Sequence, residues 1–232
     1  MVKKVLILGG SSDIGSVLAK NFLDKEENYE LHLHYNSNLK ILKNFKYKCN
    51  LIKADLSSSN YQNTLKKFNN NYDVIINLTG YITNQSFENF KIKEFYKTIN
   101  ANSLIPLLII RKSLNNMKKK NFGRIINTSS IGVKFGGGKS VFLYSLSKHI
   151  NEFIPNHIRK LSNKNILYNC LRIGVVNTKF QKKIKNKDMK KRVSLIPVRR
   201  MAKIDEITDL IFYLIDKNNF INNDVINIAG GE

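Results

Sequence analysis

The chain contains 232 residues, of which 42% are hydrophobic and 24% charged, a composition that suits one globular domain and excludes a disordered protein. Its 39 lysines and arginines outnumber its 17 acidic residues, giving a formal net charge of +22. Such a charge attracts nucleic acid, phosphorylated ligands and acidic proteins. Because basic runs alone are weak motifs, we interpret the charge as lysine enrichment on solvated faces and do not expect a nucleic-acid function.

The sequence gives no support for membrane, disulfide or metal sites. No apolar run approaches the length of a signal peptide or a membrane span. Cys49 and Cys170 have no CxxC partner, and the four histidines lack the spacing of metal ligands. We therefore expect a cytoplasmic protein with reduced thiols and no bound metal.

The first predicted strand, residues 2–8, leads directly into a turn that contains glycines. Its continuous aliphatic run is typical of a strand covered on both faces in a parallel sheet. Apolar residues at helical spacing follow the turn, between Val17 and Leu23. A glycine turn between a strand and a helix can bind a pyrophosphate through backbone N–H groups and the helix N-terminus. We expect this site at Gly9, Ser11, Ser12, Asp13, Ile14 and Gly15.

The second predicted strand, residues 30–35, ends in Asn36-Ser37. In a nucleotide-binding fold, an acidic residue at this end would bind the 2′-hydroxyl of the NAD ribose. No acidic residue stands here, and Asn36 and Ser37 can donate hydrogen bonds to a 2′-phosphate. The sequence therefore favours NADP(H) over NAD(H).

Strands and helices alternate along the rest of the chain. Strands are predicted at residues 50–54, 73–78, 124–126, 167–171 and 224–229. Helices are predicted at residues 95–119 and 204–215, and from Tyr144 toward Ser162, where Pro155 should bend or shorten the helix. This pattern predicts an α/β fold, a Rossmann-type doubly wound parallel sheet flanked by helices on both faces, in a single domain over residues 1–232. The basic stretch at about residues 179–200 lacks periodicity, and we expect it to form a small substrate lid.

The stretch NTSSIGVKFGGGKSVFLYSLSK carries groups suited to proton transfer. Ser130 closes a predicted strand, and Tyr144 and Lys148 lie four residues apart on one face of a predicted helix. A nearby ammonium would lower the pKa of the phenol from about 10, which proton transfer at neutral pH requires. Tyr213 and Lys217 have the same spacing but lack the preceding serines and glycines. We therefore expect Tyr144 and Lys148 to form the functional pair.

These motifs, in this order, resemble those of the short-chain dehydrogenase/reductase family, and in particular its single-domain acyl-carrier-protein ketoreductases. LGGSSDIG at residues 8–15 is similar to TGxxxGxG, with Leu8 and Asp13 as departures. NLTG at residues 77–80 is similar to NNAG, and IGVVNT at residues 173–178 to PGxxxT. The resemblance adds to the expected cofactor site the residues Asp55, Leu56, Asn77, Gly80, Tyr144, Lys148, Gly174, Val176 and Thr178. It places the catalytic tetrad at Asn100, Ser130, Tyr144 and Lys148.

The resemblance also implies a role for each member of the tetrad. Tyr144 would exchange a proton with the substrate oxygen while the nicotinamide exchanges a hydride with the adjacent carbon. Lys148 would lower the pKa of Tyr144 and bind the nicotinamide ribose. Ser130 would hydrogen-bond the substrate oxygen, and Asn100 would hold a water of the proton relay.

The leading hypothesis is an NADP-dependent enzyme that reduces a ketone or oxidises the corresponding secondary alcohol. A 3-oxoacyl group on an acidic acyl carrier protein is one candidate substrate, and a sugar or other small carbonyl compound is another. A non-catalytic nucleotide-sensing or nucleic-acid-binding protein is the alternative from a different class. By analogy with the family, we expect a homo-oligomer, either a tetramer or a dimer.

Overall fold

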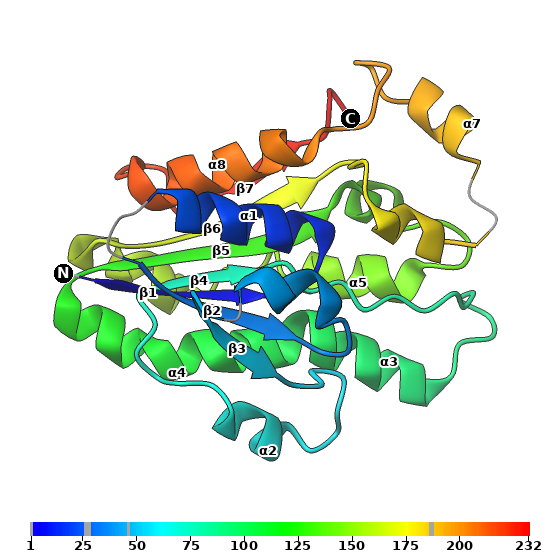
Figure 1. The fold of residues 1–232 in the computed structure, drawn as a ribbon. Coiled ribbons are helices and arrows are strands. Elements are labelled where there is room, and N and C mark those ends of the chain that lie inside the picture. Colours follow the sequence, from blue (N-terminus) through cyan, green and yellow to red (C-terminus); the bar gives the residue numbers. More distant parts are fainter. Residues whose placement is uncertain (1, 26–28, 46, 186–187) are drawn as a thin grey trace.

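A parallel β-sheet forms the centre of the molecule (Figure 1). The structure is a computed structural model that describes residues 2–25, 29–45, 47–185 and 188–232. Within these residues the sheet has seven strands in the order β3-β2-β1-β4-β5-β6-β7, with every pair parallel. The strands are β1 (Lys3–Leu8), β2 (Tyr29–Tyr35), β3 (Asn50–Lys53), β4 (Val74–Asn77), β5 (Gly123–Ser130), β6 (Ile166–Ile173) and β7 (Val225–Ile228).

Helices cover both faces of this sheet (Figure 1). One face carries α1 (Asp13–Asp24) and α8 (Ile204–Asp216), and the other carries α3 (Ile92–Ile99), α4 (Ile105–Lys120) and α5 (Phe142–Ile150). Shorter α-helices are α2 (Tyr61–Lys66), α6 (Asn156–Arg159) and α7 (Met189–Ser194), and 3₁₀ turns are η1 (Lys40–Phe45), η3 (Ile131–Phe135), η4 (Lys160–Lys164) and η5 (Lys179–Lys183). The predicted α/β doubly wound fold is confirmed.

The aliphatic run of β1 explains why the sheet is buried on both sides. Val5 and Ile7 pack with α1 and α8 in one core, whereas Leu6 and Leu8 pack with α4 in the other. Successive side chains of a strand point to opposite faces, so an uninterrupted apolar strand needs a helical layer on each side. None of the helices in the described ranges is long and apolar enough to cross a membrane.

Two predicted helices differ from the structure. The helix predicted at residues 95–119 consists of α3, a π-helical turn η2 (Asn100–Leu104) and α4, and Pro106 stands at the start of α4, where a missing N–H is tolerated. The helix predicted to run toward Ser162 ends at Ile150, and Pro155 is the N-cap of the separate helix α6. Proline therefore starts a helix in both places.

Strand order brings the functional motifs together. The chain leaves β1 toward β2 on one side of the sheet and returns to β4 on the other, so β1 and β4 flank the point where the order reverses. Ligands of such sheets bind beyond the carboxyl ends of the strands at this point. The motifs that follow β1, β4, β5 and β6 all lie at this edge.

Candidate active site

The turn after β1 exposes the N-terminus of α1. Gly9 has a φ of +80°, and a Cβ on it would lie 2.9 Å from the carbonyl oxygen of Leu78. A Cβ on Gly15 would lie 2.4 Å from the carbonyl oxygen of Gly9. Ser12 caps the helix by accepting the N–H of Gly15 at 3.0 Å. Only glycine fits both positions, and the tight turn leaves N–H groups of the first helical turn for an anion.

Lys148 is buried beneath the centre of the site, with 2% of its surface exposed. Its Nζ donates to the carbonyl oxygens of Thr79 at 2.7 Å and Thr128 at 3.1 Å, and to Oγ1 of Thr128 at 3.1 Å. These bonds hold the ammonium between the ends of β4 and β5. Burial lowers the pKa of Lys148 to about 8, so the group is still protonated at neutral pH.

Tyr144 stands one helical turn before Lys148 on α5. The Lys148 Nζ lies 5.8 Å from the centre of the Tyr144 ring and bonds to the two threonines. Burial raises the pKa of the Tyr144 phenol. This direction is opposite to the lowering predicted from Lys148, whose ammonium bonds to the two threonines.

Ser130 ends β5 and faces the same cavity as Tyr144 and Lys148. Its Oγ accepts the N–H of Gly132 at 3.2 Å and caps the turn η3. The neighbouring Ser129 instead donates to the carboxylate of Glu152 at 2.6 Å, and Arg172 binds the same carboxylate at 2.7 Å. These two bonds hold the end of β5 against α5 and β6.

Asn100 is not part of this cluster. Its Nδ2 donates to the carbonyl oxygen of Ser58 at 3.2 Å. The structure places Asn102 beside α5 instead, fully buried, with its Nδ2 donating to Oγ of Ser147 at 2.9 Å. The side chain of Asn102 also holds the backbone N–H of Tyr81 at 2.7 Å.

The carbonyl oxygen of Asn102 joins a buried amide network. It accepts Nδ2 of Asn77 at 3.3 Å and Nδ2 of Asn151 at 3.0 Å. Asn77 also donates to Oδ1 of Asn127 at 2.7 Å and accepts the Thr79 hydroxyl at 2.6 Å. Asn77 therefore does not line the cavity and joins β4, β5 and the π-helical turn behind it.

A cavity of about 890 Å³ unites most of the predicted site. Its size falls within the usual range for cofactor and ligand pockets. The predicted residues that line it are Ser11, Ser12, Asp13, Ile14, Gly80, Ser130, Tyr144, Lys148, Gly174, Val176 and Thr178. The predicted residues outside its lining are Gly9, Gly15, Asn36, Ser37, Asp55, Leu56, Asn77 and Asn100.

Four of the outlying cofactor residues follow the ends of β2 and β3. Asn36 and Ser37 are exposed, and Asn38 lines the cavity next to them. Asp55 is exposed and accepts the N–H and the hydroxyl of Ser57 at 2.9 and 2.7 Å. The side chain of Leu56 is buried in the core, so only its backbone can face a ligand.

The segment after β6 closes over the cavity. The N–H of Lys179 donates to Oδ2 of Asp13 at 2.6 Å, and the ring centre of Phe180 lies 5.4 Å from that of Tyr144. Phe180 also covers Gly80, because a Cβ there would lie 3.2 Å from the Phe180 ring. The predicted lid at residues 179–200 contains η5 and α7, and its residues 186 and 187 lie outside the described residues.

Several residues of this site leave little or no signal in the sequence. Thr79 and Thr128 hold Lys148 through backbone carbonyls, which leave no pattern in a sequence. Phe180 carried a weak signal, as the only aromatic residue of the basic segment predicted to be a lid. No signal in the sequence separates Asn102 from Asn100, because both lie in the same stretch of predicted helix.

Comparisons with known proteins agree with this geometry. A family model described as short chain dehydrogenase matches residues 3–189. The chain is 26% identical to the uncharacterized oxidoreductase YmfI of Bacillus subtilis over 247 residues, covering 100% of this chain and 99% of that protein. It is 25% identical over 189 residues to the 3-oxoacyl-[acyl-carrier-protein] reductase FabG of Buchnera aphidicola, covering 81% and 77% of the two chains.

Solved structures show the same fold. The structure titled "ElxO with NADP Bound" superposes with a TM-score of 0.81 at 25% identity and covers 100% of this chain and 98% of that one. The family match spans well over half of the chain and includes the glycine turn, β5, Tyr144 and Lys148. The chain therefore belongs to the short-chain dehydrogenase family and is an oxidoreductase of that family.

Proposed function

We propose that this oxidoreductase interconverts a ketone and a secondary alcohol with NADP(H), and that Tyr144 exchanges the proton. The observation that carries the proposal is the single cavity into which Ser130, Tyr144, Lys148 and the N-terminus of α1 all face. An anion-binding turn, a proton-exchanging group and a buried cation are the parts that hydride transfer to a carbonyl requires from a protein.

The residues around the cavity fit a nicotinamide dinucleotide. The glycine turn presents the N-terminus of α1 at one end of the cavity, and Tyr144 with Lys148 marks the other. The pyrophosphate would be held by the turn residues Ser11, Ser12, Asp13 and Ile14. The nicotinamide half would contact Gly80, Gly174, Val176, Thr178 and Lys148. The adenine would contact Asp55 and the backbone of Leu56. The turn would be shaped by Gly9 and Gly15, and Asn77 would hold the end of β4, without contact between these residues and the cofactor. The bound nicotinamide would supply or accept the hydride.

The preference for NADP(H) rests on the end of β2. Asn36 and Ser37 are exposed beside the cavity residue Asn38, so they can donate to a 2′-phosphate without a carboxylate at the strand end to repel it. ElxO, which is 25% identical to this chain, was solved with bound NADP, and this supports the same preference here.

Proton transfer would use three side chains. Tyr144 would donate its proton to the carbonyl oxygen, and Ser130 would hold that oxygen by a hydrogen bond. Lys148, a buried cation below about pH 8, would stabilise the phenolate left behind. Asn100 would take no part, because its side chain lies elsewhere. The buried network behind α5 contains the backbone carbonyl of Asn102 instead.

Apolar and basic side chains line part of the cavity. Phe135, Phe180 and Ile184 line it together with Lys139, Lys183, Lys185 and Arg192. This lining supports a 3-oxoacyl group on an acidic carrier protein as the substrate, as do relatives named 3-oxoacyl-[acyl-carrier-protein] reductase. A small carbonyl compound remains the second candidate, and residues 179–200 would act as the lid over either substrate.

Assembly and location are part of the same proposal. Leu107 on α4 and Leu146 and Ile150 on α5 are apolar and about 40% exposed. Apolar helix faces of this kind suit a homo-oligomer, a dimer or a tetramer. We place the enzyme in the cytoplasm, where its thiols Cys49 and Cys170 would stay reduced.

Cofactor binding and turnover test the proposal directly. NADPH and NADH binding would be measured by fluorescence, followed by absorbance at the reduced-nicotinamide band with 3-oxoacyl-carrier, sugar and small-ketone substrates. We expect tighter binding of NADPH and turnover of at least one ketone. Tyr144→Phe should lower kcat by about 10²-fold or more, because general acid catalysis commonly contributes that much.

Tyr213→Phe is the matched control, since Tyr213 has the same spacing to a lysine but lies on α8. It should leave kcat unchanged. Failure of the wild-type protein to bind either dinucleotide would overturn the proposal and favour a non-catalytic role.

A further inference from the structure

His34 is a buried histidine of β2 that contacts the glycine turn. It is 4% exposed, and its Nδ1 lies 3.1 Å from the backbone nitrogen of Gly9. Its Nε2 lies 3.0 Å from the carbonyl oxygen of Ala54, just after β3. The carbonyl oxygen of His34 also accepts the N–H of Gly10 at 2.8 Å. One residue thus joins the ends of three strands.

The two ring contacts fix the tautomer of His34. The N–H of Gly9 can only donate, so Nδ1 must carry a lone pair, and the carbonyl of Ala54 can only accept, so Nε2 must carry the proton. The imidazole therefore has to be neutral for both bonds to form. Protonation would add a hydrogen to Nδ1, which would then face the N–H of Gly9. The hydrogen bond from Gly9 to His34 would be lost.

We infer that His34 is a positioning residue for the cofactor turn, an inference that rests on the proposed NADP(H) chemistry. Gly9 has a left-handed backbone conformation and lies close to Leu78 on its other side, so the direction of its N–H sets the path of the turn. By accepting this N–H, His34 fixes the turn so that Ser11 to Ile14 face the cavity.

The surroundings of His34 keep it neutral at physiological pH. Burial lowers the pKa of its imidazole to about 4, and the charge of Asp55 opposes this shift only in part. The ring also packs near Phe68, which offers no charge. The Gly9 bond is therefore complete at neutral pH and is lost as the pH falls toward 4.

Two substitutions separate the ring contacts. The Asn side-chain oxygen sits as far from the backbone as Nδ1, so His34→Asn can still accept from Gly9 but cannot reach Ala54. The Gln side-chain amide reaches as far as Nε2, so His34→Gln can donate to Ala54 but leaves Gly9 unpaired. His32→Gln is the control, because His32 is 5% exposed on the same strand and bonds to Glu30 at 2.8 Å instead.

The Kd of NADPH, measured at neutral pH by fluorescence, tests the inference. We expect His34→Gln to raise it about tenfold or more, since an unpaired buried donor is costly, with kcat unchanged at saturating NADPH. His34→Asn and His32→Gln should stay close to the wild type. A wild-type Kd in His34→Gln would overturn the inference. So would an equal rise in His34→Asn and His34→Gln, because the effect would then come from the ring's packing.

A pH titration gives an independent readout if His34→Gln does not fold. Calorimetry with NADP⁺, which tolerates acid, should show affinity falling as the pH approaches 4 in the wild type, and falling less in His34→Asn. Identical pH profiles would overturn the inference. Failure of the wild type to bind NADPH or NADP⁺ would overturn the proposed function as well, which distinguishes the two failures.

Discussion

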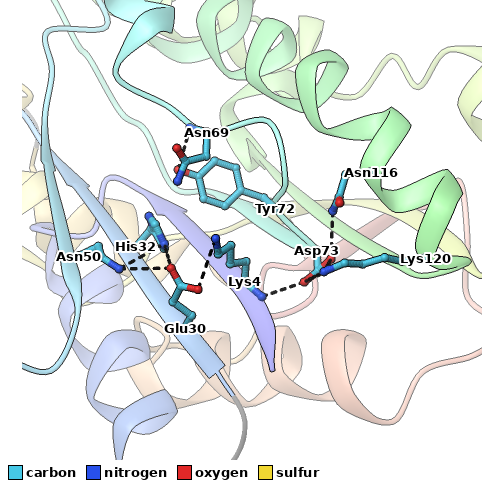
Figure 2. Close-up of polar contacts among 9 residues, drawn as sticks. All are labelled: Lys4, Glu30, His32, Asn50, Asn69, Tyr72, Asp73, Asn116 and Lys120. Atoms are coloured by element: carbon cyan, nitrogen blue, oxygen red, sulfur yellow. Dashed lines mark hydrogen bonds and ion pairs between the residues drawn. The ribbon is translucent and has the colours of Figure 1, made fainter. Parts of the chain in front are cut away.

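The two ends of the sheet differ in how a ligand could reach their buried polar groups. At the amino ends of the strands, the polar groups pair with each other. Asp73 is 2% exposed and accepts the N–H of Lys4 at 2.9 Å, Nζ of Lys120 at 2.8 Å and Nδ2 of Asn116 at 3.2 Å. Figure 2 shows these residues around its carboxylate. Glu30 joins the same end through His32. Arg124, 2% exposed at the start of β5, also lies at this end, and its guanidinium donates to carbonyl and amide oxygens.

At the carboxyl ends, Glu152 also pairs with Ser129 and Arg172, but Lys148 and Asp13 line a cavity. Among the residues that the structure describes, the partners of Lys148 Nζ are neutral oxygens, and Asp13 accepts a backbone N–H of the lid. A buried ammonium without a carboxylate partner is costly, and its lowered pKa reflects that cost. The two ends therefore differ in access: Asp73 is enclosed by its partners within the chain, whereas Lys148 lines a cavity that a ligand can enter.

The largest effect should follow from the charge of Lys148. Its pKa of about 8 lies below the ordinary value, so the ammonium is present below pH 8 and is lost as the pH rises through 8. We expect kcat/KM to fall about tenfold per pH unit above that point. The pH profile of kcat/KM measures it, and the descending limb should move to higher pH in Lys148→Arg. A profile flat to pH 10 would contradict a catalytic ammonium.

The next effect distinguishes two asparagines of one helical turn. Asn102→Ala should lower the free energy of unfolding by about 1–3 kcal/mol, because it leaves Ser147 and the Tyr81 backbone without their partner. It should also lower kcat, since α5 loses its support. Asn100→Ala, the matched variant, should change both quantities little. Chemical denaturation and steady-state kinetics measure the pair, and the reverse order of effects would restore the role first predicted for Asn100.

Asp73→Ala should affect the amino end alone. We expect a loss of about 1–3 kcal/mol of stability, because Lys4 N–H and Asn116 lose their acceptor, while the partly exposed Lys120 can turn to water. The KM for NADPH should not change. Thermal melting measures the stability, and steady-state kinetics measure the KM for NADPH. A raised KM with an unchanged Tm would mean that the two ends of the sheet are not independent.

The smallest effect concerns Asp13. Its carboxylate stands at the N-terminus of α1, in the place expected to receive a pyrophosphate, and it ties down Lys179 of the lid. Asp13→Gly removes a negative charge and this tie, so NADPH should bind a few-fold more tightly, a change of about 1 kcal/mol. Fluorescence titration measures it. Weaker binding would show instead that Asp13 helps to shape the turn.

Part of the fold and site was predictable because its signals are local. The apolar runs of β1 and β4, the glycine turn and the Tyr144–Lys148 spacing each depend on a few neighbouring residues. Asn100 was assigned by family resemblance alone, and that resemblance did not separate it from Asn102 two residues later. The π-helical turn at residues 100–104 adds a residue to the hydrogen-bonded ring, which changes the residue that faces inward.

The sequence by itself determined the doubly wound fold and the order of the motifs, because strand and helix periodicity and the glycine turn are local properties of the chain. Only the tertiary structure decided which groups meet. Thr79 and Thr128 hold Lys148, His34 holds Gly9, and Phe180 covers Tyr144, although each pair is distant in sequence. Burial then set the pKa values of Tyr144 and Lys148, since desolvation depends on all the elements that pack around a group.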